Sequence, residues 1–338
     1  MAAPPSLPLP SPSTTTSPYT CIAVLEPTSD EASDICALAI SSDGCKCLSC
    51  YEEHDAIWWD LSLPPRKQAT EVSGLGVHAA HIAMSRDGMN LVLGGGTELQ
   101  VWDAAEQDSR WLEVPGLSGD EEQGDEGEED SEALSITCVA MTGDGTYMAA
   151  GGGQPSWGWL GVCDLDRHSN APCASIDLPC GQLARVLSVS ADRTCVTAIS
   201  HENYVWSWEV GSKVLGGPVV LDGAGCFDQS AMCYDGRTAV AYKDKQVQVW
   251  DLTTGTLTAT LEGHTEELCA AAMSADGRRA VSGGNDCLVK VWDLESKTCL
   301  ATLEGHNSRI TYVALSADGS HVLSANGAGI MRVWQLQV

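Results

Sequence analysis

The chain has 338 residues, 43% of them hydrophobic, and a formal net charge of −28 from 46 acidic and 18 basic side chains. No apolar run is long enough to cross a bilayer, so we expect a soluble protein with a large core and no membrane partner. The acidic excess argues against nucleic acid as a partner, because proteins that bind phosphate backbones present basic surfaces.

The first residues are rich in Pro, Ser and Thr, and we interpret 1–17 as a disordered tail before a single folded domain at 18–338. The tail has no Lys or Arg and no continuous apolar block, so it lacks the features of a secretory signal. Without an export signal, the 15 cysteines favour small buried thiols in a reducing compartment. We therefore expect a cytoplasmic protein, with the nucleus as the alternative.

Two motifs recur seven times along the chain. The first is a polar turn, which appears as SSDG at 41, SRDG at 85, TGDG at 142, SADR at 190, CYDG at 233 and SADG at 274 and 316. The second is an alternating segment, usually containing Trp, that ends at 60, 103, 164, 209, 251, 293 and 335. The last four Trp positions of this series are 42 residues apart, and the short alternating runs between them predict four strands per unit.

The pairs Gly263-His264 and Gly305-His306 each have a Trp 28 residues after the His, at Trp292 and Trp334. With the repeats, this pattern resembles the WD-repeat family over roughly 20–338. The resemblance implies an all-β fold, a seven-bladed β-propeller of four-stranded antiparallel blades. It also implies that the outer strand of each blade comes first in its repeat.

The segment TCIAVLE at 20–26 closely matches TCLATLE at 298–304 near the opposite end of the chain. The seventh unit ends at RVWQLQV and has no residues left for its outer strand. We therefore predict that the strand at 20–26 joins the last blade and closes the ring. Closure removes the two sheet edges that an open array would expose.

The hydrogen-bond relay that the family uses within a blade can be assigned by resemblance in one unit, at His264, Ser282, Asp286 and Trp292. A Ser, His and Asp set could instead indicate a hydrolase. However, no nucleophile elbow or oxyanion-donating glycine turn accompanies it. We interpret the set as structural and predict no catalytic residues.

The relay is incomplete in the other units. The last unit keeps His306, Ser324 and Trp334 but has Ala328 where the acid belongs. Three acids, Glu53, Glu202 and Asp244, lie six residues before their Trp with no matching Gly-His pair.

The segment CKCLSC places Cys45, Cys47 and Cys50 close to His54, which could indicate zinc. Aligned by unit, Cys47 occupies the place of Ala280 and Val322, so core packing is the favoured interpretation. The GGG runs at 94–96 and 151–153 are followed by neither a helix nor a Lys, unlike phosphate-binding loops. We predict no metal and no cofactor.

Candidate partner-binding residues come from three features. Unit three runs 19 residues from Asp144 to Cys163, against 16 from Asp276 to Trp292, and the extra length carries QPSWGW. Two interpretations remain open for these aromatic residues. In the first, Trp157 is an exposed interface anchor. In the second, Trp157 or Trp159 fills the space left where Cys163 replaces the Trp of the repeat. The second feature is a set of polar residues in turns on the face of the Gly-His pairs, including His54, Tyr204 and Lys243.

The third feature is an acidic segment, 118–132, which we predict to be a disordered loop. It carries nine carboxylates and no basic residue, at Asp120, Glu121, Glu122, Asp125, Glu126, Glu128, Glu129, Asp130 and Glu132. By resemblance, this connection between units two and three opens onto the face of the Gly-His pairs. The segment either keeps the protein soluble or attracts a basic partner.

The favoured function is a non-catalytic scaffold or adaptor that binds other proteins through loops on that face. We expect a monomeric propeller within a larger complex. Two alternatives remain: an acidic-loop binder or chaperone of a basic protein such as a histone or ribosomal protein, and a sensor propeller acting with a separate signalling ATPase. An enzyme with a site in the channel would need convergent acids or metal ligands, which the sequence does not show.

Overall fold

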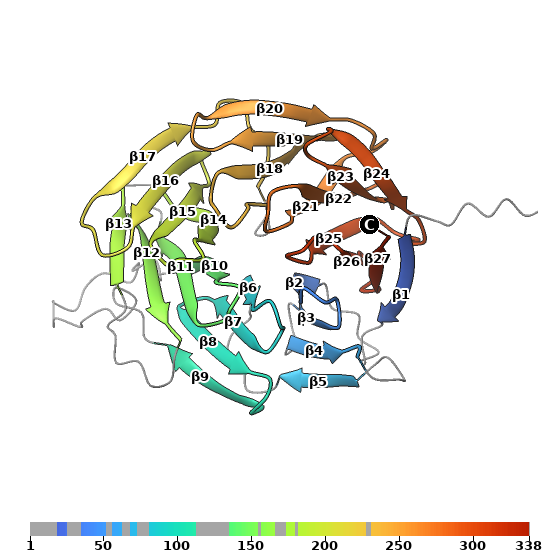
Figure 1. The fold of residues 1–338 in the computed structure, drawn as a ribbon, viewed down its shortest axis with the longest axis horizontal. Coiled ribbons are helices and arrows are strands. Elements are labelled where there is room, and N and C mark those ends of the chain that lie inside the picture. The colour runs from blue at the N-terminus through green and yellow to red at the C-terminus, as the bar shows by residue number, and fades with distance from the viewer. Residues whose placement is uncertain are drawn as a thin grey trace, which may run out of the picture.

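The structure is a computed structural model that describes residues 19–25, 35–51, 56–62, 68–72, 81–112, 135–154, 157–165, 174–179, 182–227 and 231–337. Within these ranges, 27 strands form seven antiparallel sheets that stand as blades around a central channel (Figure 1). The predicted all-β, seven-bladed propeller is confirmed.

Each of the first three blades is built from four consecutive strands, beginning with the strand nearest the channel. Blade 1 comprises β2 (Ile35–Ile40), β3 (Lys46–Tyr51), β4 (Ala56–Asp60) and β5 (Gln68–Val72). Blade 2 comprises β6 (His81–Met84), β7 (Asn90–Gly95), β8 (Glu98–Asp103) and β9 (Asp108–Leu112). Blade 3 comprises β10 (Ser135–Met141), β11 (Tyr147–Gln154), β12 (Trp157–Asp164) and β13 (Ala174–Leu178).

The remaining blades complete the ring. Blade 4 comprises β14 (Ala184–Val189), β15 (Cys195–Ser200), β16 (Tyr204–Glu209) and β17 (Leu215–Val220). Blade 5 comprises β18 (Thr238–Lys243), β19 (Gln246–Asp251) and β20 (Thr256–Leu261). Blade 6 comprises β21 (Leu268–Met273), β22 (Arg279–Gly284), β23 (Val289–Asp293) and β24 (Thr298–Leu303). Blade 7 comprises β25 (Ile310–Leu315), β26 (His321–Asn326), β27 (Met331–Leu336) and β1 (Tyr19–Leu25).

Blade 5 differs from the four-stranded pattern in its described residues. Two isolated bridges, Cys226 to Tyr242 and Met232 to Ala239, replace a continuous inner ladder beside β18. The segment still packs as an inner strand would, because Phe227 and Met232 are buried in the same cluster as Trp250.

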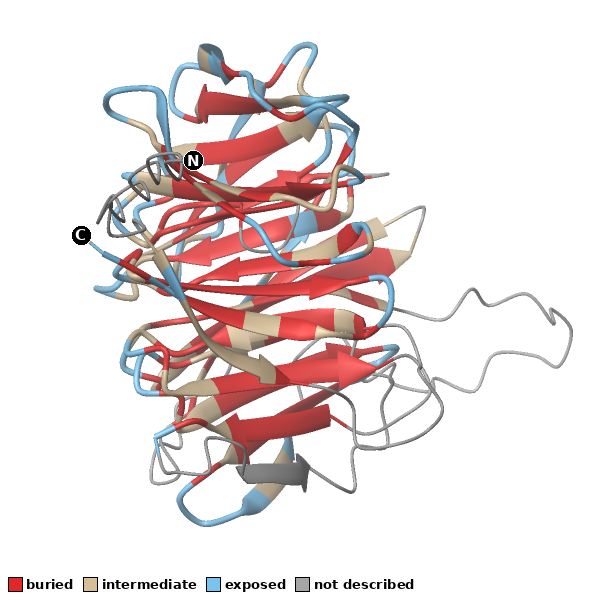
Figure 2. Ribbon diagram, turned by 90° about the vertical axis from the view of Figure 1, so that its right-hand side faces the viewer, coloured by how far each residue is buried: buried red, intermediate tan, exposed pale blue. Residues whose placement is uncertain are grey.

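The middle strands are buried on both faces, because each blade packs against a neighbour on either side (Figure 2). The Trp of the repeat is buried in six blades, at Trp59, Trp102, Trp208, Trp250, Trp292 and Trp334. Each pairs with a small or apolar residue of the second strand, and Cys47 opposite Trp59 corresponds to Ala280 opposite Trp292. Cys47 is fully buried, as the core-packing interpretation requires.

The N-terminal strand closes the ring, as predicted. β1 pairs antiparallel with β27 from Tyr19 opposite Leu336 to Leu25 opposite Met331, and Figure 1 shows it as the outer strand of blade 7. Leu25 is fully buried, and the ring of Tyr19 meets Trp334 edge-on at 5.8 Å. The two ends of the described chain therefore share one sheet.

The seven polar turns share one hydrogen-bond pattern. In each, the Asp accepts a hydrogen bond from the side chain two residues before it and another from the backbone N–H two residues after it. The side-chain donor is a hydroxyl in six turns and the thiol of Cys233 in the seventh. The fourth residue has a positive φ in every turn. It is Gly in six, where that conformation carries little cost, and Arg193, with φ 61°, in blade 4.

Backbone hydrogen bonds join these turns from one blade to the next. They run from Ser42 N–H to Arg86 C=O (2.8 Å), Arg86 N–H to Gly143 C=O (2.8 Å), Tyr234 N–H to Ala275 C=O (3.1 Å) and Ala275 N–H to Ala317 C=O (3.0 Å). All four use the second residue of a turn. This residue is thereby fixed at the rim of the channel.

Deleting residues 1–26 should destabilise the protein far more than deleting 1–17, because only the longer deletion removes β1. Loss of the fully buried Leu25 and of the pairing with β27 should lower the melting temperature by at least about 5 °C. The shorter deletion should change the melting temperature little. Differential scanning calorimetry of both truncations checks this, and equal melting temperatures would show that β1 does not close the ring.

Candidate interaction face

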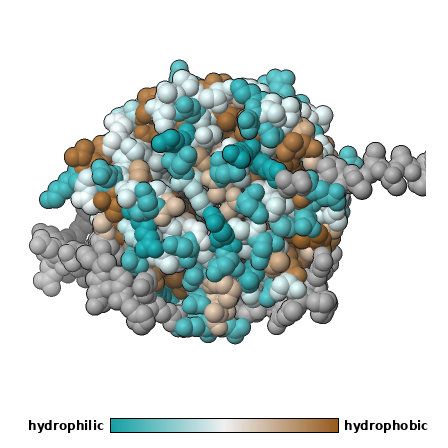
Figure 3. Space-filling view, in the orientation of Figure 1, coloured by the Kyte–Doolittle hydropathy of each residue, from teal (hydrophilic) through white to brown (hydrophobic). Residues whose placement is uncertain are grey.

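The ring has two faces with different loops. The connections that carry Gly263-His264 and Gly305-His306, and the hairpins between second and third strands, form what we call the Gly-His face. The polar turns form the opposite face, which we call the turn face. Exposed residues concentrate in the loops of both faces, whereas the strands between them are buried (Figure 2). On the face seen in Figure 3, strongly hydrophobic residues lie mostly toward the rim.

The predicted relay is present in blade 6. Trp292 Nε1 donates to Ser282 Oγ at 2.8 Å, and Ser282 Oγ lies 2.8 Å from His264 Nε2. His264 Nδ1 lies 2.8 Å from Asp286 Oδ2, which also accepts from the backbone N–H of Thr265 at 3.1 Å. A neutral His264 that donates from Nδ1 and accepts at Nε2 satisfies every contact. Burial lowers the pKa of His264 despite the opposing effect of Asp286, which fits this neutral form.

The relay fixes the position of a loop. The side chain of His264 is buried, while Glu262, Thr265, Glu266 and Glu267 beside it are exposed. Each buried hydrogen bond stabilises the fold by about 1 kcal/mol. The relay thus holds an exposed acidic loop in a defined position on the Gly-His face.

Blade 7 keeps the relay without its acid. Trp334 Nε1 donates to Ser324 Oγ at 2.9 Å, and Ser324 Oγ lies 2.7 Å from His306 Nε2. Nδ1 of His306 is buried without a hydrogen-bond partner among the described residues, because Ala328 stands where Asp286 stands in blade 6. Burial, together with the positive charge of Arg332, lowers the pKa of His306 to about 4.

Blade 4 contains a substitute that the motif search missed. Gln182 Nε2 donates to Glu202 Oε2 at 2.7 Å, so an amide replaces the histidine opposite the acid. The Gly-Gln pair at 181–182 was the available signal in the sequence. The hydrogen bond links the same two loops that His264 and Asp286 link in blade 6.

The remaining Trp side chains show where the relay is lost. In blade 1, Trp59 Nε1 still donates to Ser49 Oγ at 2.9 Å. In blade 5, Ala241 replaces the serine, and Nε1 of Trp250 is buried without a partner among the described residues. Asp244 of the same blade has φ 53° and no side-chain hydrogen bond within the described ranges.

The family comparison agrees with this geometry. The family described as WD domain, G-beta repeat matches residues 255–293 and 297–335, which contain the blades with the clearest relays. Seven blades and ring closure by the N-terminal strand complete the pattern. The chain is a WD-repeat β-propeller. No curated protein matches it.

The candidate partner-binding residues differ in where the structure places them. Tyr204 begins β16 and packs partly against the core of blade 4. Lys243 is exposed at the end of β18, and its Nζ donates to Gly223 C=O at 3.4 Å. Both lie on the Gly-His face. His54 and the segment 118–132, with all its candidate acids, lie outside the described residues.

Trp157 begins β12 and is half-buried against the core cluster that contains Trp159 and Cys163. Trp159 is 1% exposed and belongs to the same core cluster, four residues before Cys163 along β12. The side chain of Trp157, by contrast, is partly exposed.

Twelve cysteines in the described residues are free thiols, but only four of them, Cys47, Cys50, Cys138 and Cys233, are buried as expected. Cys47 and Cys50 are buried, and burial raises the pKa of both thiols. The thiol expectation is wrong at Cys163, which is disulfide-bonded. In the described part of the chain, no group of three or more His, Cys, Asp or Glu side chains is placed to hold a metal ion. Within the same residues, no helix has the length and apolarity needed to cross a membrane.

Replacing Asp286 with Ala should lower the free energy of unfolding by about 1.5 to 3 kcal/mol, because it removes a charged acceptor and leaves His264 Nδ1 buried without a partner. Asp244→Asn is the matched control, since it removes an acid from the corresponding position of blade 5 and keeps a residue that tolerates a positive φ. Urea denaturation of both variants measures the difference. Equal losses would contradict a stabilising relay.

Ala328→Asp should stabilise blade 7 by about 1 kcal/mol, because a carboxylate at this position can accept from His306 Nδ1. The folded pKa of His306, about 4, lies below the unfolded value near 6.5. The unfolded state therefore binds more protons, and stability falls as pH drops from about 6.5 to about 4. In the variant, the His306 pKa should rise and this acid-dependent loss should shrink. Denaturation at pH 7 and pH 4.5 measures it; an unchanged pH dependence would contradict the assignment.

Proposed function

We propose that this propeller is a non-catalytic adaptor that binds other proteins through the loops of its Gly-His face. The observation that supports this is the relay in blade 6, which fixes a loop whose neighbouring side chains are exposed and charged. A fixed loop loses little conformational entropy when a partner binds, so its contacts contribute more fully to affinity.

Further contacts stiffen the same region. Lys245 Nζ donates to Thr265 C=O at 2.5 Å, which ties the hairpin of blade 5 to the loop of blade 6. Gln246 Nε2 donates to Glu262 Oε1 at 2.9 Å within the same surface. Glu266 and Glu267 remain exposed on top of this framework. They are positioned to contact a partner that carries basic or hydrogen-bond-donating groups.

The acidic segment 118–132 supports a second, narrower candidate: capture of a basic protein, of histone or ribosomal type. Nine carboxylates without a basic residue would attract such a partner and accelerate its encounter with the propeller. Trp157 would add an aromatic anchor in the adjoining blade. The sensor-propeller alternative depends on the family resemblance alone, and we do not propose it.

A comparative pull-down tests the adaptor function. The Glu266→Lys/Glu267→Lys variant should lose specific partners, because it reverses two charges on the fixed loop. The Glu106→Lys/Glu295→Lys variant makes the same change in charge at exposed positions on the turn face and should keep them. Identical partners for both variants and the unmodified protein would contradict binding through this loop.

A third variant, with the nine acids of 120–132 replaced by Ser and Gln, separates the two candidates. If the segment captures basic partners, their binding should weaken in this variant. In the unmodified protein it should also weaken as salt shortens the screening length from about 10 Å at 0.1 M toward about 3 Å at 1 M. Unaltered binding at low salt would leave the segment with a solubility role.

A further inference from the structure

The second residue of each polar turn sets the chemistry of the channel on the turn face. This residue is small in five blades, at Ser42, Gly143, Ala191, Ala275 and Ala317. It is large in the other two, at Arg86 in blade 2 and Tyr234 in blade 5. Inter-blade backbone hydrogen bonds fix both residues, through Arg86 N–H to Gly143 C=O and Tyr234 N–H to Ala275 C=O. Five small residues leave an opening across which two long side chains extend.

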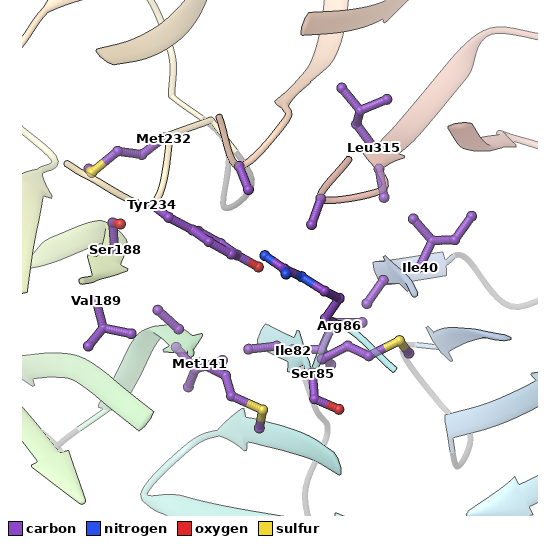
Figure 4. A pocket seen from close by; sticks show the side chains of 18 of the residues that line it. Ile40, Ile82, Ser85, Arg86, Met141, Ser188, Val189, Met232, Tyr234 and Leu315 are labelled. Carbon is purple, nitrogen blue, oxygen red and sulfur yellow. The ribbon is translucent and has the colours of Figure 1, made fainter. Parts of the chain in front are cut away.

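Arg86 and Tyr234 point toward one another across this opening (Figure 4). Within the described chain, the Arg86 guanidinium makes no ion pair and no hydrogen bond. Burial raises the pKa of Tyr234, so its phenol is protonated at neutral pH and can donate a hydrogen bond. Two donor groups, one of them charged, therefore face the same space.

Next to these donors is a cavity of about 130 Å³ whose wall combines apolar side chains with the hydroxyl groups of Ser42, Ser85 and Ser188. Its walls include Ile40, Met84, Met141, Met232 and Leu315, which come from four blades and the segment leading to a fifth. Arg86 is the one charged side chain among the described lining residues. The buried Oγ of Ser42 beside it has no hydrogen-bond partner in the same part of the chain. A volume of about 150 Å³ can hold a ring the size of benzene, so the apolar part of this space, between the Met, Ile and Leu side chains, has room for a short hydrocarbon chain.

The turn carboxylates surround the opening without neutralising Arg86. Each is bound to the hydroxyl or thiol and the backbone N–H of its own turn; Asp87, next to Arg86, accepts from Ser85 Oγ at 2.6 Å and from Met89 N–H at 3.0 Å. Seven carboxylates around one opening repel incoming anions, and more strongly those with two or more charges. A monoanion is therefore favoured over a phosphate.

We propose that the channel on the turn face binds a carboxylate carried on a short aliphatic chain, with the carboxylate held by Arg86 and Tyr234 and the chain in the methionine-lined cavity. Arginine matches a carboxylate with two parallel hydrogen bonds, and the phenol adds a third donor. Free fatty acids of short chain and the C-terminus of a polypeptide ending in an aliphatic residue share this chemistry. The site lies on the face opposite the proposed adaptor loops and does not depend on them.

Isothermal titration calorimetry with the full-length protein tests the site, using hexanoate and an acetylated tripeptide ending in Leu as probes. Hexanamide and the C-terminally amidated tripeptide are the neutral controls and should bind at least about tenfold more weakly. Arg86→Met keeps the length of the side chain without its charge and should weaken binding about tenfold or more. Tyr234→Phe removes only the hydroxyl and should weaken binding about threefold to tenfold.

Arg278→Met is the control for long-range electrostatics, because it removes a charge from an exposed turn on the same face. It should leave binding within about twofold of the unmodified protein. Binding of hexanoate assigns the site to small acids, and binding of the tripeptide alone assigns it to polypeptide C-termini. The proposal is wrong if neither probe binds, if the amides bind equally well, or if Arg86→Met binds as tightly as the unmodified protein.

Discussion

Pairing between β1 and β27 is the interaction on which the ring depends. Every blade packs only against its two neighbours, so an unclosed array would end in two exposed faces. Closure instead builds one core cluster from both ends of the chain, in which Leu25, Ile35 and Trp59 pack with Ala325 and Val333. Joining segments more than 300 residues apart costs conformational entropy, but this cost rises only slowly with loop length. A few well-buried side chains in one strand offset it.

The closed ring places the seven polar turns, which share one local sequence pattern, at equivalent positions around the channel. In each polar turn, the first residue supplies a hydroxyl or thiol, the third a carboxylate and the fourth a positive φ. The second residue has no such duty within its turn, yet in four turns, at Ser42, Arg86, Tyr234 and Ala275, its backbone N–H bonds to the next blade. Its side chain therefore lies at a fixed place on the channel rim whatever its identity. Arg86 and Tyr234 can face each other because the ring, and not their own turns, determines their positions.

The sequence predicted the features that depend on period and local pattern. The repeat predicted seven blades, the match between 20–26 and 298–304 predicted closure, and Gly263-His264 predicted the relay. The sequence did not predict features that depend on which residues come together in the folded ring. Gln182 replaces a histidine in a connection of different length, so spacing does not reveal it. The isolated bridges that the described inner segment of blade 5 makes with β18 leave no mark in the repeat, and the facing of Arg86 and Tyr234 requires the closed ring.

The two faces of the propeller carry specificity in different ways. On the Gly-His face, the connections differ in length and in their relay residues, so each blade offers its own surface, and blade 6 fixes its loop most firmly through His264 and Asp286. On the turn face, the backbone repeats almost unchanged, and chemical identity is concentrated in the single position that the turn leaves free. Since rigid strands separate the faces, a ligand in the channel and a protein on the loops need not compete for the same atoms. One ring can therefore hold two independent binding functions without altering the hydrogen bonds that keep it closed.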